Sequence, residues 1–361
     1  MNQLLIQSEP KSKSRIIASS GVFQIELLDH VGQDDYPTLI EISKHLKSQY
    51  GEKAVLTKTT IQKYFNKSKV KINCVACGEK GKFSFKKEGF SYYECQKCKT
   101  LFVNPRPKED SFENFYKKSS SIKFLSTNLY KKTKEARKRK IFEPRAKMIF
   151  KILKEKKIKN YNCIDIGGGT GIFAKEISKL IKKEVIVIEP SPFLAEDCIK
   201  KKLTVVQKFL ENVKKEDLPT GRKVFTCFEL IEHLHSPSKF IKNLSKLMSK
   251  KDLFIFTTLS GTGTDILALW ENSRAIFPPF HINFFNPKSI SIFLRKHKFK
   301  ILDICTPGNI DINILDNDKL VIKDRFWKTF LNIATKTEKL KMQNLISNLN
   351  FSSHMMAVCK K

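Results

Sequence analysis

The sequence predicts an α/β fold, in which helices cover both faces of a parallel sheet, preceded by a small cysteine-rich module. Three observations predict this architecture. Short apolar runs alternate with amphipathic stretches from about Ile158 onward, a glycine-rich turn follows the first run, and two Cys-x-x-C pairs stand upstream of both. Alternating strands and helices form parallel sheets, because a helix must carry the chain from the end of one strand to the start of the next.

The alternation gives each element of the sheet domain in order. Strands are expected at residues 162–166, 185–188, 203–206, 224–228, 253–258, 300–305 and 354–359. Helices are expected at residues 172–181, 192–200, 240–248, 287–297, 319–332 and 337–348. The strand runs are short and rich in Ile, Val and Phe, whereas the helical stretches place apolar residues three and four positions apart.

Residues 1–70 predict a small helical module with helices at 16–31, 38–46 and 56–66. The last two helices are ordered as in a helix-turn-helix, whose final helix enters the DNA major groove. Their connection of roughly nine residues is longer than the 3–4 residues of that motif's turn. A helical cap or dimerisation module is therefore favoured, and a helix-turn-helix-like module is the alternative.

Four cysteines predict a zinc ribbon over residues 71–107. Cys74 and Cys77 form one Cys-x-x-C pair, Cys95 and Cys98 form another, and two short aromatic strands are expected between them. Such pairs place four thiolates tetrahedrally around one Zn²⁺, and four sulfurs leave no open position, so the metal would be structural. A redox pair or two disulfides are the alternatives.

The glycine-rich turn predicts a nucleoside-binding edge of the sheet. Asp165 is followed by glycines at alternate positions, Gly167, Gly169 and Gly171, between the first strand and the first helix. Glycines let the backbone turn sharply and approach a ligand closely. The next strand ends on Glu189, whose carboxylate can accept hydrogen bonds from two ribose hydroxyls. A glycine-rich turn in some other α/β protein is the alternative.

The spacing of the glycines indicates which nucleoside is bound. A dinucleotide turn has the pattern G-x-G-x-x-G and points a helix N-terminus at a pyrophosphate. Here the pattern is Asp-x-Gly-x-Gly-x-Gly, and an acid is attracted by a sulfonium cation but repelled by a pyrophosphate. The segment resembles motif I of the class I S-adenosylmethionine-dependent methyltransferases.

The resemblance covers about Ile72 to the C-terminus. It is to bacterial class I methyltransferases with an N-terminal four-cysteine zinc ribbon, often associated with surface-polysaccharide or sugar biosynthesis. Beside the ribbon and the glycine loop, it rests on Phe102-Val-Asn-Pro-Arg-Pro, Glu229-Leu-Ile-Glu-His-Leu, Pro278-Pro-Phe-His-Ile-Asn-Phe-Phe and Thr306-Pro-Gly-Asn-Ile-Asp-Ile. It implies a Rossmann-like class I methyltransferase sheet with an antiparallel last strand. Residues 1–70 match no family.

The resemblance also implies the cofactor-binding residues. These are Asp165, Gly167, Gly168, Gly169, Gly171, Glu189, Pro190, Phe209 and Glu229. One departure concerns the adenine ring, since many relatives place an acid directly after the third strand. Here that region reads Val206-Gln-Lys-Phe-Leu-Glu, so either Glu211 or Gln207 with backbone groups would contact adenine.

Two histidines are candidates for a general base that activates an acceptor hydroxyl. His233 follows the fourth strand, at the carboxyl end of the sheet, where open α/β sheets bind ligands. His281 lies in the Pro/Phe-rich loop after the fifth strand, and a neutral imidazole can take a hydroxyl proton near pH 7. A structural role, in capping or packing, is the alternative for each.

The net charge of +32 comes mainly from lysine, with only nine arginines. Readers of nucleic acid favour arginine for bidentate contacts, so we do not expect nucleic acid as a partner. The densest positive charge lies at residues 117–160. A solvated helix face explains it most simply, and a surface for an anionic substrate is the alternative. No apolar run approaches the ~18 residues of a membrane span.

The sequence thus predicts a cytoplasmic methyltransferase with S-adenosyl-L-methionine as cofactor and a structural Zn²⁺. Residues 1–70 would form the helical module, 71–107 the ribbon, 108–157 a basic helical connector or lid, and 158–361 the S-adenosylmethionine-binding domain. The expected acceptor is a small polar molecule, such as a nucleotide-linked sugar or a glycan, methylated on a hydroxyl or carbon. The alternatives are an RNA or protein methyltransferase that uses the ribbon for recognition, and a DNA-binding regulator with a cofactor-sensing domain.

Overall fold

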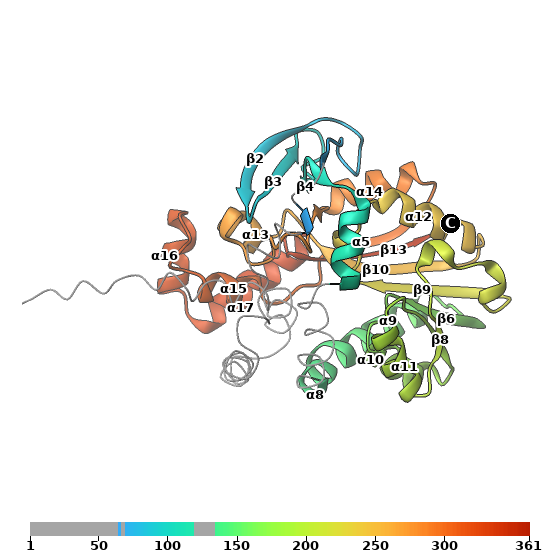
Figure 1. Ribbon diagram of the computed structural model, residues 1–361. Helices are drawn as coiled ribbons and strands as arrows, with labels where there is room; N and C mark the ends of the chain where they lie inside the picture. The colour runs from blue at the N-terminus through green and yellow to red at the C-terminus, as the bar shows by residue number, and fades with distance from the viewer. Residues whose placement is uncertain (1–63, 66–68, 119–133) are drawn as a thin grey trace, which may run out of the picture.

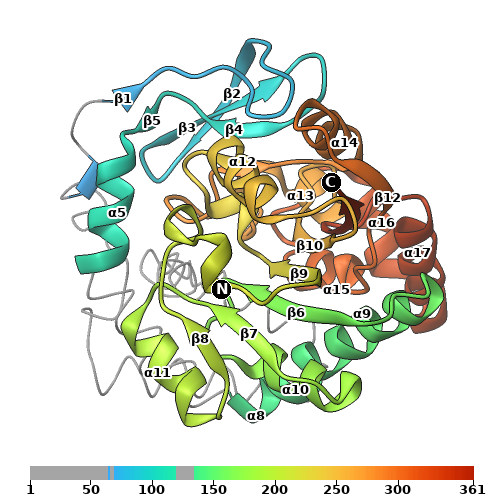
Figure 2. The same ribbon diagram turned by 90° about the vertical axis from the view of Figure 1, so that its right-hand side faces the viewer.

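The sheet domain has the predicted α/β architecture. The computed structural model describes residues 64–65, 69–118 and 134–361, and the predicted helices of residues 1–63 lie outside this part of the chain. A seven-stranded sheet has the order β12-β13-β10-β9-β6-β7-β8 (Figure 2). Its strands are β6 (Tyr161–Ile166), β7 (Val185–Ile188), β8 (Thr204–Val206), β9 (Arg222–Phe228), β10 (Leu253–Leu259), β12 (Lys300–Cys305) and β13 (His354–Lys360).

The direction of each strand agrees with the prediction. β6 pairs in parallel with β7 and β9, β7 with β8, and β9 with β10. β13 runs antiparallel between β10 and β12, so the predicted antiparallel last strand is confirmed. The carboxyl ends of β6, β7, β8, β9 and β10 therefore meet at one edge of the sheet, which is where ligands bind in open α/β sheets.

Helices cover both faces of the sheet (Figure 1). Apolar side chains alternate between the two faces along each strand, as the two-residue period of a strand requires. Cys163, Val224 and Ile255 pack against α9 (Glu143–Glu155), α10 (Ile172–Ile181) and α11 (Pro192–Lys200) on one face. The opposite face packs against α12 (Pro237–Leu247) and α14 (Pro287–Lys296).

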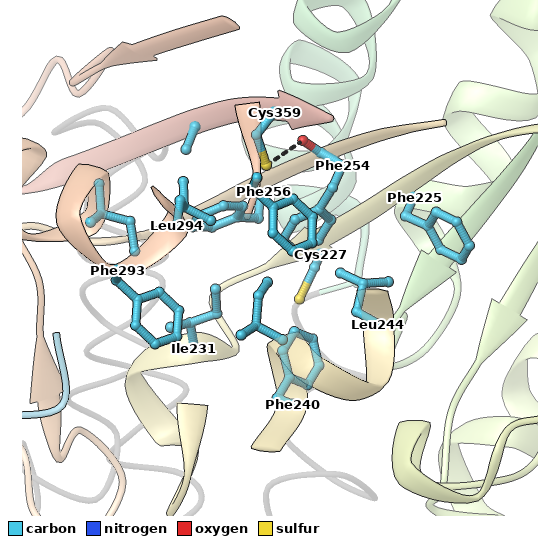
Figure 3. Packing of buried hydrophobic residues seen from close by; sticks show 14 of the residues in the cluster. Phe225, Cys227, Ile231, Phe240, Leu244, Phe254, Phe256, Phe293, Leu294 and Cys359 are labelled. Atoms are coloured by element: carbon cyan, nitrogen blue, oxygen red, sulfur yellow. Dashed lines mark hydrogen bonds between the residues drawn. The ribbon is translucent and has the colours of Figure 1, made fainter. Parts of the chain in front are cut away.

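Figure 3 shows the core on this second face. Phe254 and Phe256 of β10 stack with ring centroids 4.8 Å apart, and Phe240 of α12 and Phe293 of α14 are buried in the same cluster. β10 is buried at every position, because helices cover it on both faces and strands flank it on both sides. Burial of such large apolar side chains contributes roughly 25 cal/mol per Å² removed from water.

The ribbon forms a sheet that the core domain completes. β2 (Gly81–Lys87) and β3 (Phe90–Cys95) match the predicted hairpin, and β4 (Leu101–Val103) adds a third strand. The fourth strand, β11 (Asn283–Phe284), comes from the loop after β10 and pairs antiparallel with β4. A short two-stranded sheet, β1 (Lys69–Val70) with β5 (Arg106–Pro107), closes the ribbon exit.

Buried polar side chains reinforce this junction between ribbon and core. Arg106 is 1% exposed and donates hydrogen bonds to the backbone oxygen of His235 and to Oδ1 of Asn283. Asn286 donates through Nδ2 to the backbone oxygen of Cys98 at 2.8 Å. Hydrogen bonds to a charged donor are stronger than neutral ones, so the ribbon is attached to the β11 loop by polar contacts as well as by strand pairing.

The basic connector is helical where it is described. It contains α5 (Glu109–Lys118), α8 (Lys134–Arg137), a π-helical turn (Lys138–Phe142) and α9. The predicted solvated face holds for many of its lysines but not for two arginines, since Arg137 and Arg145 are buried. Both arginines lie over aromatic rings, Arg137 over Phe142 and Arg145 over Phe228.

The C-terminal helices differ in part from the prediction. Instead of one helix over 319–332, the chain forms α15 (Asp311–Asn317) and α16 (Arg325–Ile333), while α17 (Lys336–Asn348) is as expected. α16 begins late because the Asp324 side chain caps it, accepting from the backbone nitrogen of Trp327 at 2.9 Å. A further helix, α13 (Thr264–Leu269), precedes the β11 loop. Within the described ranges, no helix has the length and apolarity of a membrane span.

Candidate functional site

The glycine loop connects β6 to α10 at the carboxyl edge of the sheet. Gly167, Gly169 and Gly171 all have positive φ angles, between +56° and +71°, which L side chains rarely adopt. A Cβ on Gly168 would lie 2.6 Å from Val187 Cγ1, so this position requires glycine for space. The loop therefore passes close over the ends of β6 and β7, as the sequence predicts.

Glu189 is held at the end of β7 by two backbone N–H groups. Gly169 donates to its Oε2 and Ser191 to its Oε1, each at 2.9 Å. Burial raises the pKa of Glu189 to about 7, although these two hydrogen bonds oppose the shift. A carboxylate offers about four acceptor positions, so two remain for ribose hydroxyls. The ribose contact itself stays a prediction.

Asp165 lies beneath the glycine loop. It is 1% exposed and its Oδ1 accepts a hydrogen bond from Thr226 Oγ1 at 2.8 Å. Burial raises its pKa to about 7, and the nearby Glu189 charge acts in the same direction. Asp165 can thus support the loop and supply negative charge below it, whereas its predicted contact with the cofactor is not tested.

The remaining predicted cofactor residues follow neighbouring strands. Pro190 is half-buried directly after Glu189, and Phe209 follows β8 with 48% of its surface exposed. An exposed aromatic ring at this edge could stack on adenine. Glu211, the candidate for the adenine amino group, is exposed in the short helical turn after Phe209. These assignments stay predictions.

Glu229 follows β9 and has two close partners that the sequence did not indicate, the buried Arg145 and the half-buried His354. Its Oε1 lies 3.5 Å from Nη2 of Arg145 and 3.6 Å from Nε2 of His354, and it accepts a hydrogen bond from Thr257. Burial alone would raise the pKa of Glu229, but the charges of His354 and Arg145 outweigh it and lower the pKa to about 2. Arg145 stood in a lysine-rich helix, and nothing in that pattern distinguishes a buried arginine from a solvated one.

The structure brings the two predicted histidines together with Glu232. One ligand atom from each of Glu232, His233 and His281 lies within 4.8 Å of the others, and the two imidazole centroids are 4.8 Å apart. Glu232 and His233 lie in the short 3-10 helix Ile231–His233 after β9, and His281 lies just before β11. This helix follows Leu230, whose side chain contacts the position of a Gly167 Cβ, so the cluster and the glycine loop share one edge of the sheet.

Burial controls the protonation of this cluster. It lowers the pKa of His281 to about 3, with a further contribution from His233, so the His281 ring is neutral near pH 7. A ring of such low pKa is a weak proton acceptor, because base strength falls with pKa. Burial and the Glu229 charge raise the pKa of Glu232 well above its usual range. The role of either histidine as general base stays a prediction.

The four ribbon cysteines also lie together. The Sγ atoms of Cys74 and Cys98, and of Cys77 and Cys98, are 3.5 Å apart, and those of Cys77 and Cys95 are 3.4 Å apart. Four ligands about 2.3 Å from a tetrahedral Zn²⁺ would lie about 3.8 Å from one another. Disulfide sulfurs would be about 2 Å apart, so the arrangement fits a metal and not the disulfide alternative.

Similar proteins are methyltransferases. Residues 133–304 match a family described as "Methyltransferase domain". The ubiquinone biosynthesis O-methyltransferase of Pelagibacter ubique (strain HTCC1062) is 27% identical over 197 residues, which are 50% of this chain and 76% of the relative. Residues 133–304 therefore form a methyltransferase domain, and the chain is an S-adenosylmethionine-dependent methyltransferase.

Solved structures with similarity to this chain include two further methyltransferases. The plantazolicin methyltransferase BpumL, in complex with SAH, has 14% sequence identity and a TM-score of 0.44, with 69% of this chain and 93% of that chain covered. An S-adenosylmethionine-dependent methyltransferase from Clostridium acetobutylicum ATCC 824 has 13% sequence identity and a TM-score of 0.40, with 64% of this chain and 99% of that chain covered.

The raised pKa of Glu189 makes a prediction about stability. Its ordinary pKa of 4.5 rises to about 7, so between these pH values the folded chain holds a proton that the unfolded chain has lost. The free energy of unfolding of the cofactor-free protein should therefore fall as pH rises through this window. In Glu189→Gln this fall should be smaller by about 2–3 kcal/mol, as measured by urea unfolding at pH 5 and pH 8.

The matched control is Glu196→Gln, which removes an exposed carboxyl paired with Lys200. It should leave the pH profile of the wild type unchanged. If the free energy of unfolding of Glu189→Gln changes with pH in parallel with that of the wild type, Glu189 is charged throughout this range. Burial then does not raise its pKa, and the prediction is wrong.

Proposed function

We propose that this methyltransferase transfers the methyl group of S-adenosylmethionine to a hydroxyl oxygen of a small polar acceptor, such as a nucleotide-linked sugar or a glycan. The observation that carries the proposal is the shared sheet edge, where the glycine loop and Glu189 lie beside the cluster of Glu232, His233 and His281. The relative from Pelagibacter ubique is an O-methyltransferase, and this activity supports oxygen as the acceptor atom.

Residues of the glycine loop and of the neighbouring strand ends would hold the cofactor. Glu189 is oriented by Gly169 and Ser191, and it would accept hydrogen bonds from the ribose hydroxyls. Phe209 would cover the adenine ring, and Asp165 would place negative charge below the loop. The bound cofactor supplies a methyl group already activated by its sulfonium, so the protein mainly has to position the acceptor in line and exclude water.

The acceptor hydroxyl would bind beside His281 and His233. The rings of His281 and Phe284 are roughly perpendicular with centroids 6.1 Å apart, and Phe277 stacks on Phe280 in the same loop. Such a surrounding excludes water from the reacting groups. Exposed lysines of the basic connector would contribute positive charge for a diphosphate of the acceptor.

The ribbon cysteines would bind one structural Zn²⁺. Their sulfur separations fit a tetrahedron, and all four positions would be occupied by protein. Because β4 pairs with β11 and Asn286 bonds to Cys98, the ion would also stabilise the loop that carries His281. The ribbon would therefore serve the acceptor half of the site and not the cofactor half.

Cofactor binding should depend on Glu189. In Glu189→Ala, S-adenosylhomocysteine should bind about 2–3 kcal/mol more weakly, because one carboxylate accepts two charge-assisted hydrogen bonds. Isothermal titration calorimetry measures this change, with Glu196→Ala as the exposed control. Tight binding of NAD by the wild type, with no heat from S-adenosylhomocysteine, would exclude the proposed cofactor site.

The acceptor class is tested in the same preparation by a turnover screen over nucleotide sugars, RNA and protein. Production of S-adenosylhomocysteine only with nucleotide sugars or glycans supports the proposal. Turnover with RNA or protein alone contradicts it.

Loss of the ribbon zinc should affect turnover more than cofactor affinity. One Zn²⁺ per chain should copurify, and Cys95→Ser should lose it, lowering turnover at least about 10-fold while S-adenosylhomocysteine affinity stays within about 2-fold. The reason is that the ribbon pairs through β4 with the β11 loop, which carries His281, so that loss of the metal would loosen this loop first. Metal analysis measures the zinc content, the rate of S-adenosylhomocysteine production measures turnover, and calorimetry measures the affinity.

The half-buried Cys305 provides the control Cys305→Ser, which should keep the metal. Zinc below about half an equivalent, in protein purified without chelator, would count against the site.

A further inference from the structure

Glu232, His233 and His281 come from two segments that the fold fixes against each other. The backbone nitrogen of Ile282 donates to the backbone oxygen of Glu232 at 3.0 Å, and Nδ2 of Asn283 donates to the backbone oxygen of Leu234 at 2.7 Å. These contacts therefore hold together the two backbone segments that carry the three side chains. A preorganised set of nitrogen and oxygen ligands is the first requirement of a metal site.

The hydrogen bonds of the two histidines determine their tautomers. Nδ1 of His281 lies 2.6 Å from the backbone oxygen of Ala275, and Nδ1 of His233 lies 3.1 Å from that of Phe280. A carbonyl oxygen can only accept, so each Nδ1 carries the hydrogen and each neutral ring keeps its lone pair on Nε2. Metal-binding histidines are oriented in this way, with the other ring nitrogen donating to a carbonyl or carboxylate.

Glu232 contributes a buried carboxyl to the cluster. Its side chain is fully buried, and its Oε2 accepts from Thr258 Oγ1 at 2.8 Å. Its Oε1 accepts from no N–H or hydroxyl donor among the described residues, and the carboxyl is hydrogen-bonded to that of Glu229. Two buried carboxyls in contact cannot both be charged unless a cation lies beside them, and an ion bound by Glu232 would supply that charge.

The separations within the cluster suit a shared ion. Oxygen and nitrogen ligands about 2.1 Å from one ion lie at most about 4.2 Å apart, and the three ligand atoms here lie within 4.8 Å of one another. A small inward shift of side chains would therefore complete the site. Two imidazoles and one carboxylate suit divalent first-row transition metals, whereas the four thiolates of the ribbon suit softer or thiophilic ions.

We propose that Glu232, His233 and His281 bind a divalent first-row transition-metal ion, with open positions that take the oxygen of the methyl acceptor. The second part of this proposal rests on the proposed function. An acceptor hydroxyl bound to such an ion would have a lowered pKa and would pass its proton to a water molecule at another open position of the ion. The oxygen lone pair then forms the bond to the methyl carbon, while the carbon–sulfur bond breaks and its electron pair stays on sulfur. In this scheme the histidines hold the ion and do not take the proton.

The test titrates Mn²⁺ into the full chain, which retains its ribbon zinc. Mn²⁺ prefers oxygen and nitrogen ligands over thiolates, and the electron paramagnetic resonance signal of free Mn²⁺ reports the bound fraction. The wild type should bind one Mn²⁺ per chain beside the zinc. Glu232→Gln and His281→Ala should each weaken this binding at least about 100-fold. His297→Ala, in a histidine that bonds to Ser238 on the α12 face, should bind Mn²⁺ as the wild type does.

Folding and cofactor binding are followed separately in each variant. Glu232→Gln keeps the shape of the side chain and its hydrogen bond to Thr258. It therefore tests the metal site even if His281→Ala fails to fold. Absence of Mn²⁺ binding by the wild type, or unchanged binding in Glu232→Gln, overturns the metal site even if S-adenosylhomocysteine binds normally. Failure of S-adenosylhomocysteine to bind a wild type that binds Mn²⁺ overturns the proposed function instead.

Discussion

The pairing of β11 with β4 is the contact on which the candidate site depends. Two residues of the core loop, Asn283 and Phe284, become the edge strand of the ribbon sheet. Without this pairing the loop between α13 and α14, which carries His281, would keep only its contacts to the core domain. With it, the loop is held between the ribbon on one side and the turn after β9 on the other, so His281 is placed beside Glu232 and His233.

The two halves of the site are built by different parts of the fold. The cofactor half depends on short-range features at the ends of β6 and β7, where Gly169 and Ser191 hold the Glu189 carboxylate. The acceptor half depends on contacts between residues far apart in the chain, such as Arg106 with Asn283 and Asn286 with Cys98. A ribbon metal would therefore influence the acceptor half while leaving the glycine loop in place.

Local patterns explain which features the sequence could predict. The bounds of α10, β7 and α11 coincide with the expected ones, because periodicity, glycine spacing and capping act over a few residues. The pairing of β4 with β11 joins segments about 180 residues apart, and a two-residue strand has no periodicity of its own. The partners of Glu229, which are Arg145 and His354, were missed for the same reason. A sequence pattern shows that a residue is charged, but it does not show with which distant charged residue the side chain pairs.

Hydrogen exchange in Cys77→Ser tests most directly whether the ribbon holds the acceptor loop. The variant should lose the ribbon zinc, and the amides of residues 280–286 should then exchange at least about 10-fold faster than in the wild type. Amides of β6 and β9 should keep their protection, since they pair within the core sheet. If the ribbon amides exchange freely while residues 280–286 stay as protected as in the wild type, the loop is held by the core alone and the account is contradicted.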